Sequence, residues 1–337
     1  MNVRRHRISG IPGIALAATA ALGLGTLTAC SSDTAAAGNT DKFDVVASFY
    51  PMAFLAEQIG GDHVKVTSLT EPGQEPHDLE ISAKQTAQLQ ESDAALYLKG
   101  LQPSVDEAIT QSGIKTKIDA ASLTSLEEHG TEVGEHADEH ADEHAGEHAD
   151  EHADEHGHSH EGEGGKDPHI WLDPVKYAEV AEGVGKAFEK ADPDHAADYK
   201  KNTEALVKRL GELNTKFETG LKNTDTKVFI TTHAAFGYLA ERYGLTEEAI
   251  SGLDPESEPS AARVKDLATM AKADGVSTVF YETLVSDKTA KTLAKDARLK
   301  TDVLDPIEGI TDKSRGDDYF QVMEANLKAL QQALGAK

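Results

Sequence analysis

The stretch FDVVASFYPMAFLAEQIGGDHVKVTSL, residues 43–69, decides the fold class. Its β-branched and aromatic beginning predicts a strand over Phe43–Phe49. A helix is predicted over Pro51–Ile59, and a second strand over Val64–Leu69. A helix of this length between two strands indicates a βαβ unit, in which the strands run parallel. The chain is therefore expected to be an α/β protein.

The same alternation continues on both sides of a long helical region. Further strands are predicted at Ala94–Leu98, Lys227–Thr232, Thr278–Glu282 and Thr301–Leu304. Further helices are predicted at Ser82–Ser92, Val105–Ser112, Ala234–Tyr243, Ser260–Ala273, Asp287–Ala297 and Asp317–Leu334. Between the two α/β parts, apolar residues at helical spacing predict a helix of about 27 residues, which would span roughly 40 Å. That apolar stripe consists of Leu206, Leu210, Leu213, Phe217 and Leu221.

These patterns predict two α/β lobes with parallel sheets, joined by a long rigid helix. The first lobe is expected over residues 43–173, the linking helices over 174–222 and the second lobe over 223–337. Because clefts between domains are favoured ligand sites, the interlobe cleft is the expected binding site.

The N-terminus predicts export and lipid anchoring. Arg4, Arg5 and Arg7 precede an apolar stretch that ends in Leu27-Thr28-Ala29-Cys30, which resembles the lipobox of bacterial lipoproteins. Residues 1–29 are therefore expected to be a signal peptide, with Cys30, the one cysteine of the chain, carrying the lipid. Residues 30–42 are small and polar, and predict a flexible tether to the bilayer.

Charge argues against one class of partner. The formal net charge is −26, and residues 127–163 hold fifteen acidic residues without a lysine or arginine, so the rest of the chain carries −26 + 15 = −11. An acidic surface of this kind does not attract a phosphate backbone, which needs clustered lysine and arginine. We therefore expect no nucleic-acid partner.

The acidic segment also repeats a Glu-His-Ala-Asp unit. An insert without a packed core is predicted over residues 127–165. Neutral imidazoles four residues apart suit zinc and similar divalent metals, so several weak, exchangeable metal sites are expected there. The histidines concerned are His136, His140, His144, His148, His152, His156, His158 and His160.

Outside the insert, three histidines stand in loops that suit a binding site. His77 follows a predicted strand in a Pro/Gly-rich loop, His169 lies at the junction to the linking helices, and His233 ends the strand over Val228–Thr232. In parallel sheets, ligands gather beyond the carboxyl ends of strands. His63 and His195 stand in polar turns and are interpreted as surface residues.

Four motifs extend this pattern and resemble one family. They are Pro76-His77-Asp78, Asp167-Pro-His-Ile-Trp-Leu-Asp-Pro174, Thr231-Thr-His-Ala-Ala-Phe-Gly-Tyr238 and Ser251-Gly-Leu-Asp-Pro-Glu-Ser-Glu-Pro-Ser260. Together they resemble the cluster 9 (A-I) metal-binding lipoproteins of ABC importers, in particular the zinc members of the ZnuA/AdcA kind. The resemblance covers nearly all of residues 43–337.

The resemblance implies a set of metal ligands. His77, His169 and His233 match the family's three histidines, and Glu308 matches a carboxylate that completes the site in some zinc members. Asp305 is the alternative, and water is a third possibility. Three imidazoles and one carboxylate give zinc a tetrahedral shell. Glu282 and Asp254 are candidates to hydrogen-bond the ligating rings, and Trp171 and Phe236 to shield the site from water.

The function that follows is capture of Zn²⁺ outside the cytoplasm and its delivery to the permease of an ABC importer, by a monomer that is not an enzyme. The alternatives are the same role for manganese or another divalent metal, a zinc-dependent hydrolase, and a surface adhesin. No nucleophile–base pair stands out beside the histidines, which speaks against the hydrolase.

Overall fold

The computed structural model describes residues 42–129 and 165–337. The predicted signal peptide, Cys30, almost all of the tether and the eight histidines of the repeat lie outside the described residues.

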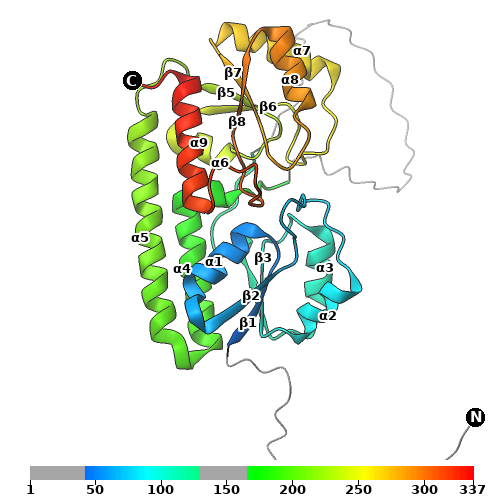
Figure 1. The fold of residues 1–337 in the computed structure, drawn as a ribbon, viewed down its shortest axis with the longest axis vertical. Coiled ribbons are helices and arrows are strands. Elements are labelled where there is room, and N and C mark those ends of the chain that lie inside the picture. The colour runs from blue at the N-terminus through cyan, green and yellow to red at the C-terminus, as the bar shows by residue number, and fades with distance from the viewer. Residues whose placement is uncertain (1–41, 130–164) are drawn as a thin grey trace, which may run out of the picture. The chain divides into compact units, whose positions relative to one another are not determined.

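The first lobe is built on a four-stranded parallel sheet with the strand order β2-β1-β3-β4. Its strands are β1 (Phe43–Ala47), β2 (Val64–Ser68), β3 (Ala94–Tyr97) and β4 (Thr116–Asp119). The helices between them are α1 (Tyr50–Gly60), α2 (Ala83–Glu91) and α3 (Pro103–Gln111). Alternate residues of β1 point to opposite faces, so Val45 and Ala47 pack with α1 whereas Val46 packs with α2 and α3. Figure 1 shows these helices on the two sides of the sheet.

The second lobe repeats this plan with the order β6-β5-β7-β8, again all parallel. Its strands are β5 (Val228–Thr231), β6 (Thr246–Ala249), β7 (Thr278–Tyr281) and β8 (Lys300–Val303). Its helices are α6 (Gly237–Tyr243), α7 (Ala261–Ala273), α8 (Lys288–Ala297) and α9 (Tyr319–Leu334). Helices α7 and α8 cover the face of the sheet that includes Ile230 and Val279. The prediction of two parallel α/β lobes is confirmed.

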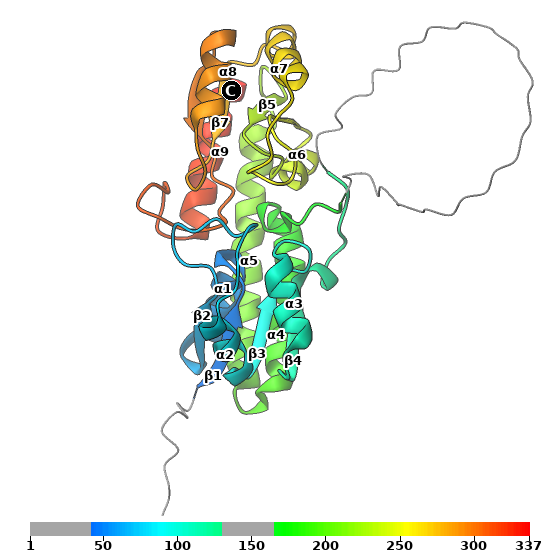
Figure 2. The ribbon, with the colours of Figure 1, turned by 90° about the vertical axis from the view of Figure 1, so that its right-hand side faces the viewer.

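Two helices join the lobes. Helix α4 (Pro174–Ala191) is followed by a short turn and by α5 (Ala196–Leu221), whose 26 residues span roughly 39 Å. Helix α5 packs against α1 of the first lobe and against α9 of the second, and Figures 1 and 2 show it beside both. Its buried residues include the whole apolar stripe that the sequence predicts. The long linking helix is therefore confirmed.

The local sequence does not predict two of the strands and the start of one helix. Strands β4 and β6 have the sequences TKID and TEEA, which lack an apolar run. Both lie at an edge of their sheet, where the exposed Lys117 of β4 discourages further pairing. In β6 the carboxylate of Glu247 turns inward and accepts hydrogen bonds from Thr231 and Phe236. Helix α6 begins at Gly237 rather than at Ala234, since its first helical bond runs from the backbone NH of Ala240 to the carbonyl of Phe236.

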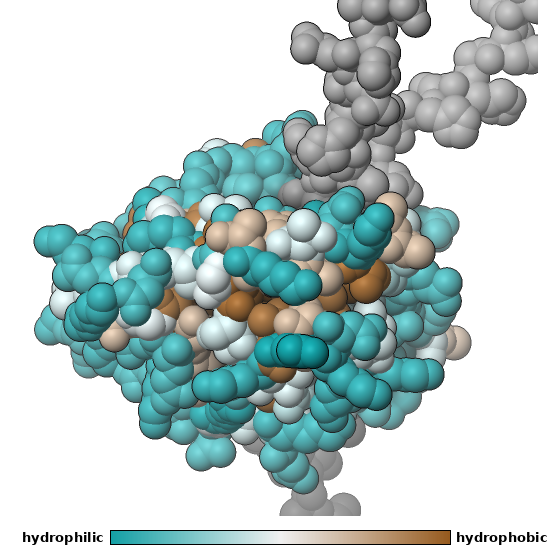
Figure 3. Space-filling model, turned by 90° about the horizontal axis from the view of Figure 1, so that it is seen from above, coloured by the Kyte–Doolittle hydropathy of each residue, from teal (hydrophilic) through white to brown (hydrophobic). Residues whose placement is uncertain are grey.

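Among the described residues, no helix is both long and apolar enough to cross a membrane. The end of the molecule that is uppermost in Figure 1 is drawn in Figure 3. Hydrophilic residues form most of this face, and hydrophobic ones gather near its middle.

Candidate metal centre

Four side chains from distant parts of the chain meet between the lobes. His77 lies in the loop between β2 and α2, His169 directly precedes the turn Ile170–Leu172, His233 follows β5 and Glu308 follows β8. One potential ligand atom from each of these residues lies within 4.8 Å of all the others. The three histidines and the glutamate that the sequence singles out are therefore brought together.

The carboxylate of Glu308 lies at the centre of the group. Its Oε1 is 3.2 Å from Nε2 of His77, 3.4 Å from Nε2 of His169 and 3.6 Å from Nε2 of His233. Its other oxygen is buried and has no hydrogen-bond partner in residues 42–129 and 165–337. A buried polar atom without a partner is costly and uncommon. Three imidazole nitrogens and a carboxylate facing one small space form a donor set that suits zinc.

Buried carboxylates orient two of the rings. Asp167 Oδ1 accepts hydrogen bonds from the backbone NH and from Nδ1 of His169, at 2.9 and 2.7 Å, and Glu282 Oε1 lies 2.6 Å from Nδ1 of His233. Each carboxylate thereby leaves Nε2 facing the group, which is the usual arrangement around metal-ligating histidines. The expectation for Glu282 is confirmed. Asp167 was missed, although it stands in the same motif as His169.

Asp254, the other candidate for this role, has a different task. It is exposed, and its Oδ1 accepts a hydrogen bond from the backbone NH of Glu256, 2.8 Å away. A short acidic side chain in a turn commonly bonds to the backbone two residues on. The prediction for Asp254 was wrong, because its carboxylate shapes its own loop.

Asp305 lies beside the group without joining it. Its carboxylate accepts hydrogen bonds from the backbone NH of Ile307 and from the hydroxyl of Thr283, and its backbone bonds to the side chain of Asn326. Asp305 is therefore occupied in holding the loop that carries Glu308. Ile307 in this loop has a φ of 60°, a left-handed conformation that is a genuine outlier for a β-branched residue. Such strain costs about 1–3 kcal/mol and is retained when the surroundings enforce it.

The mutual arrangement shifts the pKa values of the buried groups. Burial by itself lowers the pKa of His169, but hydrogen bonds with Asp167 and Glu308 outweigh it and raise that pKa. Burial also lowers the pKa of His233, but the charges of Glu282 and Glu308 and their hydrogen bonds with the ring outweigh it. The pKa of His233 is therefore raised well above its usual value. Burial raises the pKa of Glu308, but the three imidazoles hold it well below its usual range. In the metal-free protein the arrangement thus favours the charged form of Glu308 and the protonated forms of His169 and His233.

The aromatic ring of Trp171 packs against the group on one side. Trp171 is fully buried, and its ring centre lies 5.2 Å from that of His169. Phe236 is buried as well. His77 is the most accessible member, with 11% of its side chain exposed, whereas the side chains of the other three are at most 1% exposed. His77 therefore marks the side from which solvent reaches the group.

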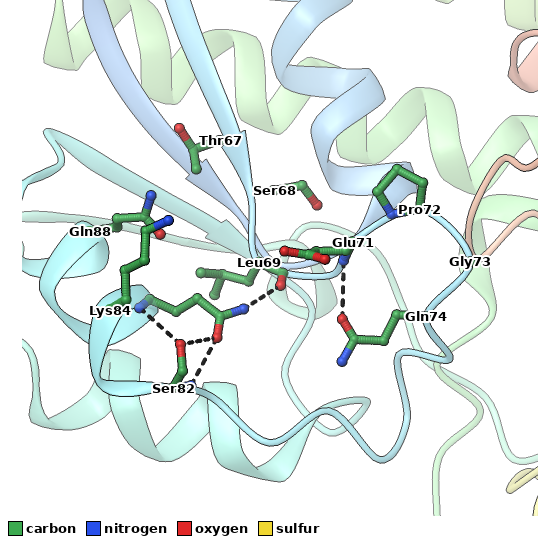
Figure 4. A pocket seen from close by; sticks show the side chains of 11 residues that line it. Thr67, Ser68, Leu69, Glu71, Pro72, Gly73, Gln74, Ser82, Lys84 and Gln88 are labelled. Carbon is green, nitrogen blue, oxygen red and sulfur yellow. Dashed lines mark hydrogen bonds between the residues drawn. The ribbon is translucent and has the colours of Figure 1, made fainter.

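Two pockets flank the loop that leads to His77. One, of about 540 Å³, is shown in Figure 4 beside residues 71–74, where Glu71 donates its backbone NH to the side chain of Gln74 at 3.2 Å. The other, of about 790 Å³, lies between Pro72 and Gly73 of the first lobe and residues 310–317 of the second. Neither lining includes His77, so both pockets lie beside the group of four and are distinct from it.

The remaining described histidines fall into two kinds. His63 and His195 stack on each other with ring centres 4.0 Å apart and bond to Asp198 and Asp192, away from the group of four, which confirms their interpretation. His129 was assigned to the insert. The structure instead places it against Asp167 and Glu241, with a nitrogen–oxygen distance of 3.0 Å to the first.

The start of the insert needs the same correction. Glu127 was also assigned to it, yet its backbone NH bonds to Tyr238 and its carbonyl accepts from Asp167. Composition cannot reveal such an anchor, because a Glu and a His at the edge of an acidic repeat look like the repeat itself.

Comparison with known proteins gives one consistent result. Residues 45–333 match the ZnuA family, described as zinc-uptake complex component A, periplasmic. The chain is 36% identical to the zinc-binding lipoprotein AdcA of Streptococcus pneumoniae over 91% of its own length but only 58% of that relative. It is 36% identical to the high-affinity zinc uptake system protein ZnuA of Bacillus subtilis, covering 94% of this chain and 98% of that one. The crystal structure of the Zn(II)-bound ZnuA-like domain of S. pneumoniae AdcA has a TM-score of 0.67 and 33% identity, over 87% of this chain and 99% of that domain.

Proposed function

The chain belongs to the ZnuA family, the periplasmic component A of zinc-uptake complexes, and from this premise we propose that it binds Zn²⁺ between its lobes and delivers it to a membrane importer. The observation that carries the proposal is the group of three imidazoles and one carboxylate whose ligand atoms lie within 4.8 Å of one another. The protein is thus a carrier rather than an enzyme, and the anchor at Cys30 keeps the monomer close to the permease.

His77, His169, His233 and Glu308 are the proposed ligands. This set favours zinc over manganese, because manganese prefers more oxygen ligands and a higher coordination number. The buried Trp171 covers one side of the site, and the four proposed ligands would fill the coordination shell of zinc. A substrate would therefore have no place beside the metal. This argues against hydrolysis and for tight capture.

Release requires a ligand to move, and His77 is suited to do so. It lies in a loop without regular secondary structure, whereas helix α5 packs on both lobes and restrains their relative motion. The pocket between Pro72, Gly73 and residues 310–317 lies beside the two loops that carry His77 and Glu308. We infer that the permease binds this side of the protein and that the loop of His77 moves first when the metal is released.

Elemental analysis tests the proposal directly. The full chain, purified without added metal and dialysed against a competing chelator, is expected to retain one zinc ion per chain. His233→Ala is expected to retain none, whereas the matched variant His63→Ala, outside the group, should keep it. Retention of manganese instead of zinc, or equal retention by His233→Ala, would contradict the proposed site.

Zinc affinity should also depend on pH. Protons compete with the metal for imidazole nitrogens, and the pKa values of His169 and His233 are raised. The loss of affinity is therefore expected to begin above the ordinary histidine pKa of about 6.5 and to steepen as the pH falls. Chelator competition at a series of pH values between 8 and 5 measures this. A constant affinity over that range would show that imidazoles do not hold the metal.

A further inference from the structure

One carboxylate in the loop between β2 and α2 has no role in the site described so far. Glu75 is partly buried, and its two oxygens accept hydrogen bonds from the backbone NH of His77 at 3.1 Å and from that of Asp78 at 3.2 Å. Pro76, which lies between Glu75 and His77, has no NH to donate. The carboxylate therefore binds the first two NH groups that follow it in the chain.

These residues are arranged like the start of a helix. Pro76 takes the first position of the turn, where its fixed φ is favoured, and its carbonyl accepts a hydrogen bond from the backbone NH of Leu79 at 3.2 Å. Such a turn leaves the NH groups of its second and third residues free, and a side-chain oxygen of the preceding residue commonly accepts one of them. Glu75 takes this capping position and accepts both. A carboxylate also binds NH groups more strongly than a neutral acceptor does.

The cap holds His77 in a way that differs from the other two histidines. Asp167 and Glu282 orient the rings of His169 and His233 through Nδ1. For His77, no partner of Nδ1 lies within hydrogen-bond distance in residues 42–129 and 165–337, and its ring bonds only through Nε2, which is 3.2 Å from Glu308. The direction of this ring is therefore set by its backbone, which the carboxylate before it fixes.

The rest of the loop offers His77 little support. Residues 71–74 are exposed, and their hydrogen bonds run between Glu71 and Gln74, one of which is drawn in Figure 4. Within the part of the chain that the structure describes, residues 71–78 make one hydrogen bond to another part of the fold, which is the bond between His77 and Glu308. The cap at Glu75 is thus the contact that organises this segment from within.

We propose that Glu75 is a positioning residue for zinc capture, which holds the turn of His77 so that Nε2 faces the other three ligands. The inference rests on the proposed function, because it assigns a role in the same site. Without the cap, two NH groups of the turn lose their acceptor and the loop samples other conformations. Zinc affinity then falls in proportion to the fraction of molecules that still present His77 correctly.

Chelator competition on the full chain tests this role. Glu75→Ala removes both acceptors and is expected to weaken zinc binding at least about tenfold, the lower end of the usual cost of losing an outer partner of a metal ligand. Glu75→Asp should recover most of the affinity, because aspartate is itself a preferred capping residue. Glu71→Ala removes the same charge from an exposed position of the same loop and should leave the affinity unchanged.

A double-mutant cycle with His77→Ala shows whether Glu75 acts through His77. In the His77→Ala background, Glu75→Ala is expected to change zinc affinity by less than about twofold, because no ring is left to be positioned. A full tenfold loss in that background would assign the effect to charge or to folding and would overturn the inference. Unchanged affinity in Glu75→Ala, or an equal loss in Glu75→Asp, would overturn it as well.

Failure of the metal site itself would be recognised separately. It would appear as equal zinc affinity of the unaltered chain and of His77→Ala, two proteins that both keep Glu75. That result would remove His77 from the proposed ligands and the positioning role with it. A loss of affinity in His77→Ala together with unchanged affinity in Glu75→Ala would instead leave the site in place and refute only the role of Glu75.

Discussion

Replacing Glu308 with alanine is expected to weaken zinc binding by more than about a hundredfold. The carboxylate lies within 3.6 Å of Nε2 of all three histidines, so its loss removes both a ligand and the negative charge at the centre of the group. Loss of an outer partner of a metal ligand already costs 10–100-fold, and loss of the ligand itself should cost more. Chelator competition on the full chain measures the change.

Glu308→Gln and Glu71→Gln make the test specific. The glutamine keeps the shape of Glu308 but removes its charge, so a smaller loss of zinc affinity is expected than with alanine. Glu71 is an exposed carboxylate in the loop between β2 and α2, outside the group, and its replacement should have no effect. Unchanged affinity in Glu308→Ala would mean that water, rather than this carboxylate, completes the site.

Replacing Trp171 with alanine is expected to lower the free energy of unfolding by about 3–5 kcal/mol, the usual cost of truncating a buried tryptophan. Its ring contacts Phe49 of the first lobe edge-to-face at 5.0 Å, and its Nε1 donates a hydrogen bond to the carbonyl of Pro306 in the second lobe. One side chain thus ties the lobes together and fixes the loop before Glu308. Urea unfolding of the metal-free chain measures the loss.

Trp171→Phe separates packing from the hydrogen bond. It keeps most of the ring but leaves the carbonyl of Pro306 without its donor, which should cost about 1–3 kcal/mol. Zinc affinity should fall as well, because this hydrogen bond positions the loop of Glu308. A loss below about 1 kcal/mol in Trp171→Ala would show that the junction between the lobes does not depend on this residue.

The fold was predictable from the sequence to the extent that its elements are locally encoded. The apolar stripe of α5 and the β-branched runs of β1 and β5 determine their own conformations through periodicity. Strands β4 and β6 carry no such pattern. They are strands because β3 and β5 offer them unpaired edges, and that influence does not appear in their own residues.

The candidate site divides in the same way. His77 and His233 stood out because they follow predicted strands, and the carboxyl ends of parallel strands are where ligands gather. The resemblance favoured Glu308 as the fourth ligand, and Asp305 stayed as the alternative because both carboxylates stand in the same loop. The structure separates them: Ile307, between the two, has a left-handed backbone, and Trp171 and Asn326 from elsewhere in the chain bond to the backbone of Pro306 and Asp305.

The sequence by itself determined which chemical groups are available and which local elements carry them. Only the tertiary structure decided which groups meet: Glu308 reaches His77 across 231 residues, and Asp167 serves both His169 and His129. The physical reason is that propensity and periodicity act over a few residues. The convergence of donors depends instead on how two separately encoded sheets pack against one long helix.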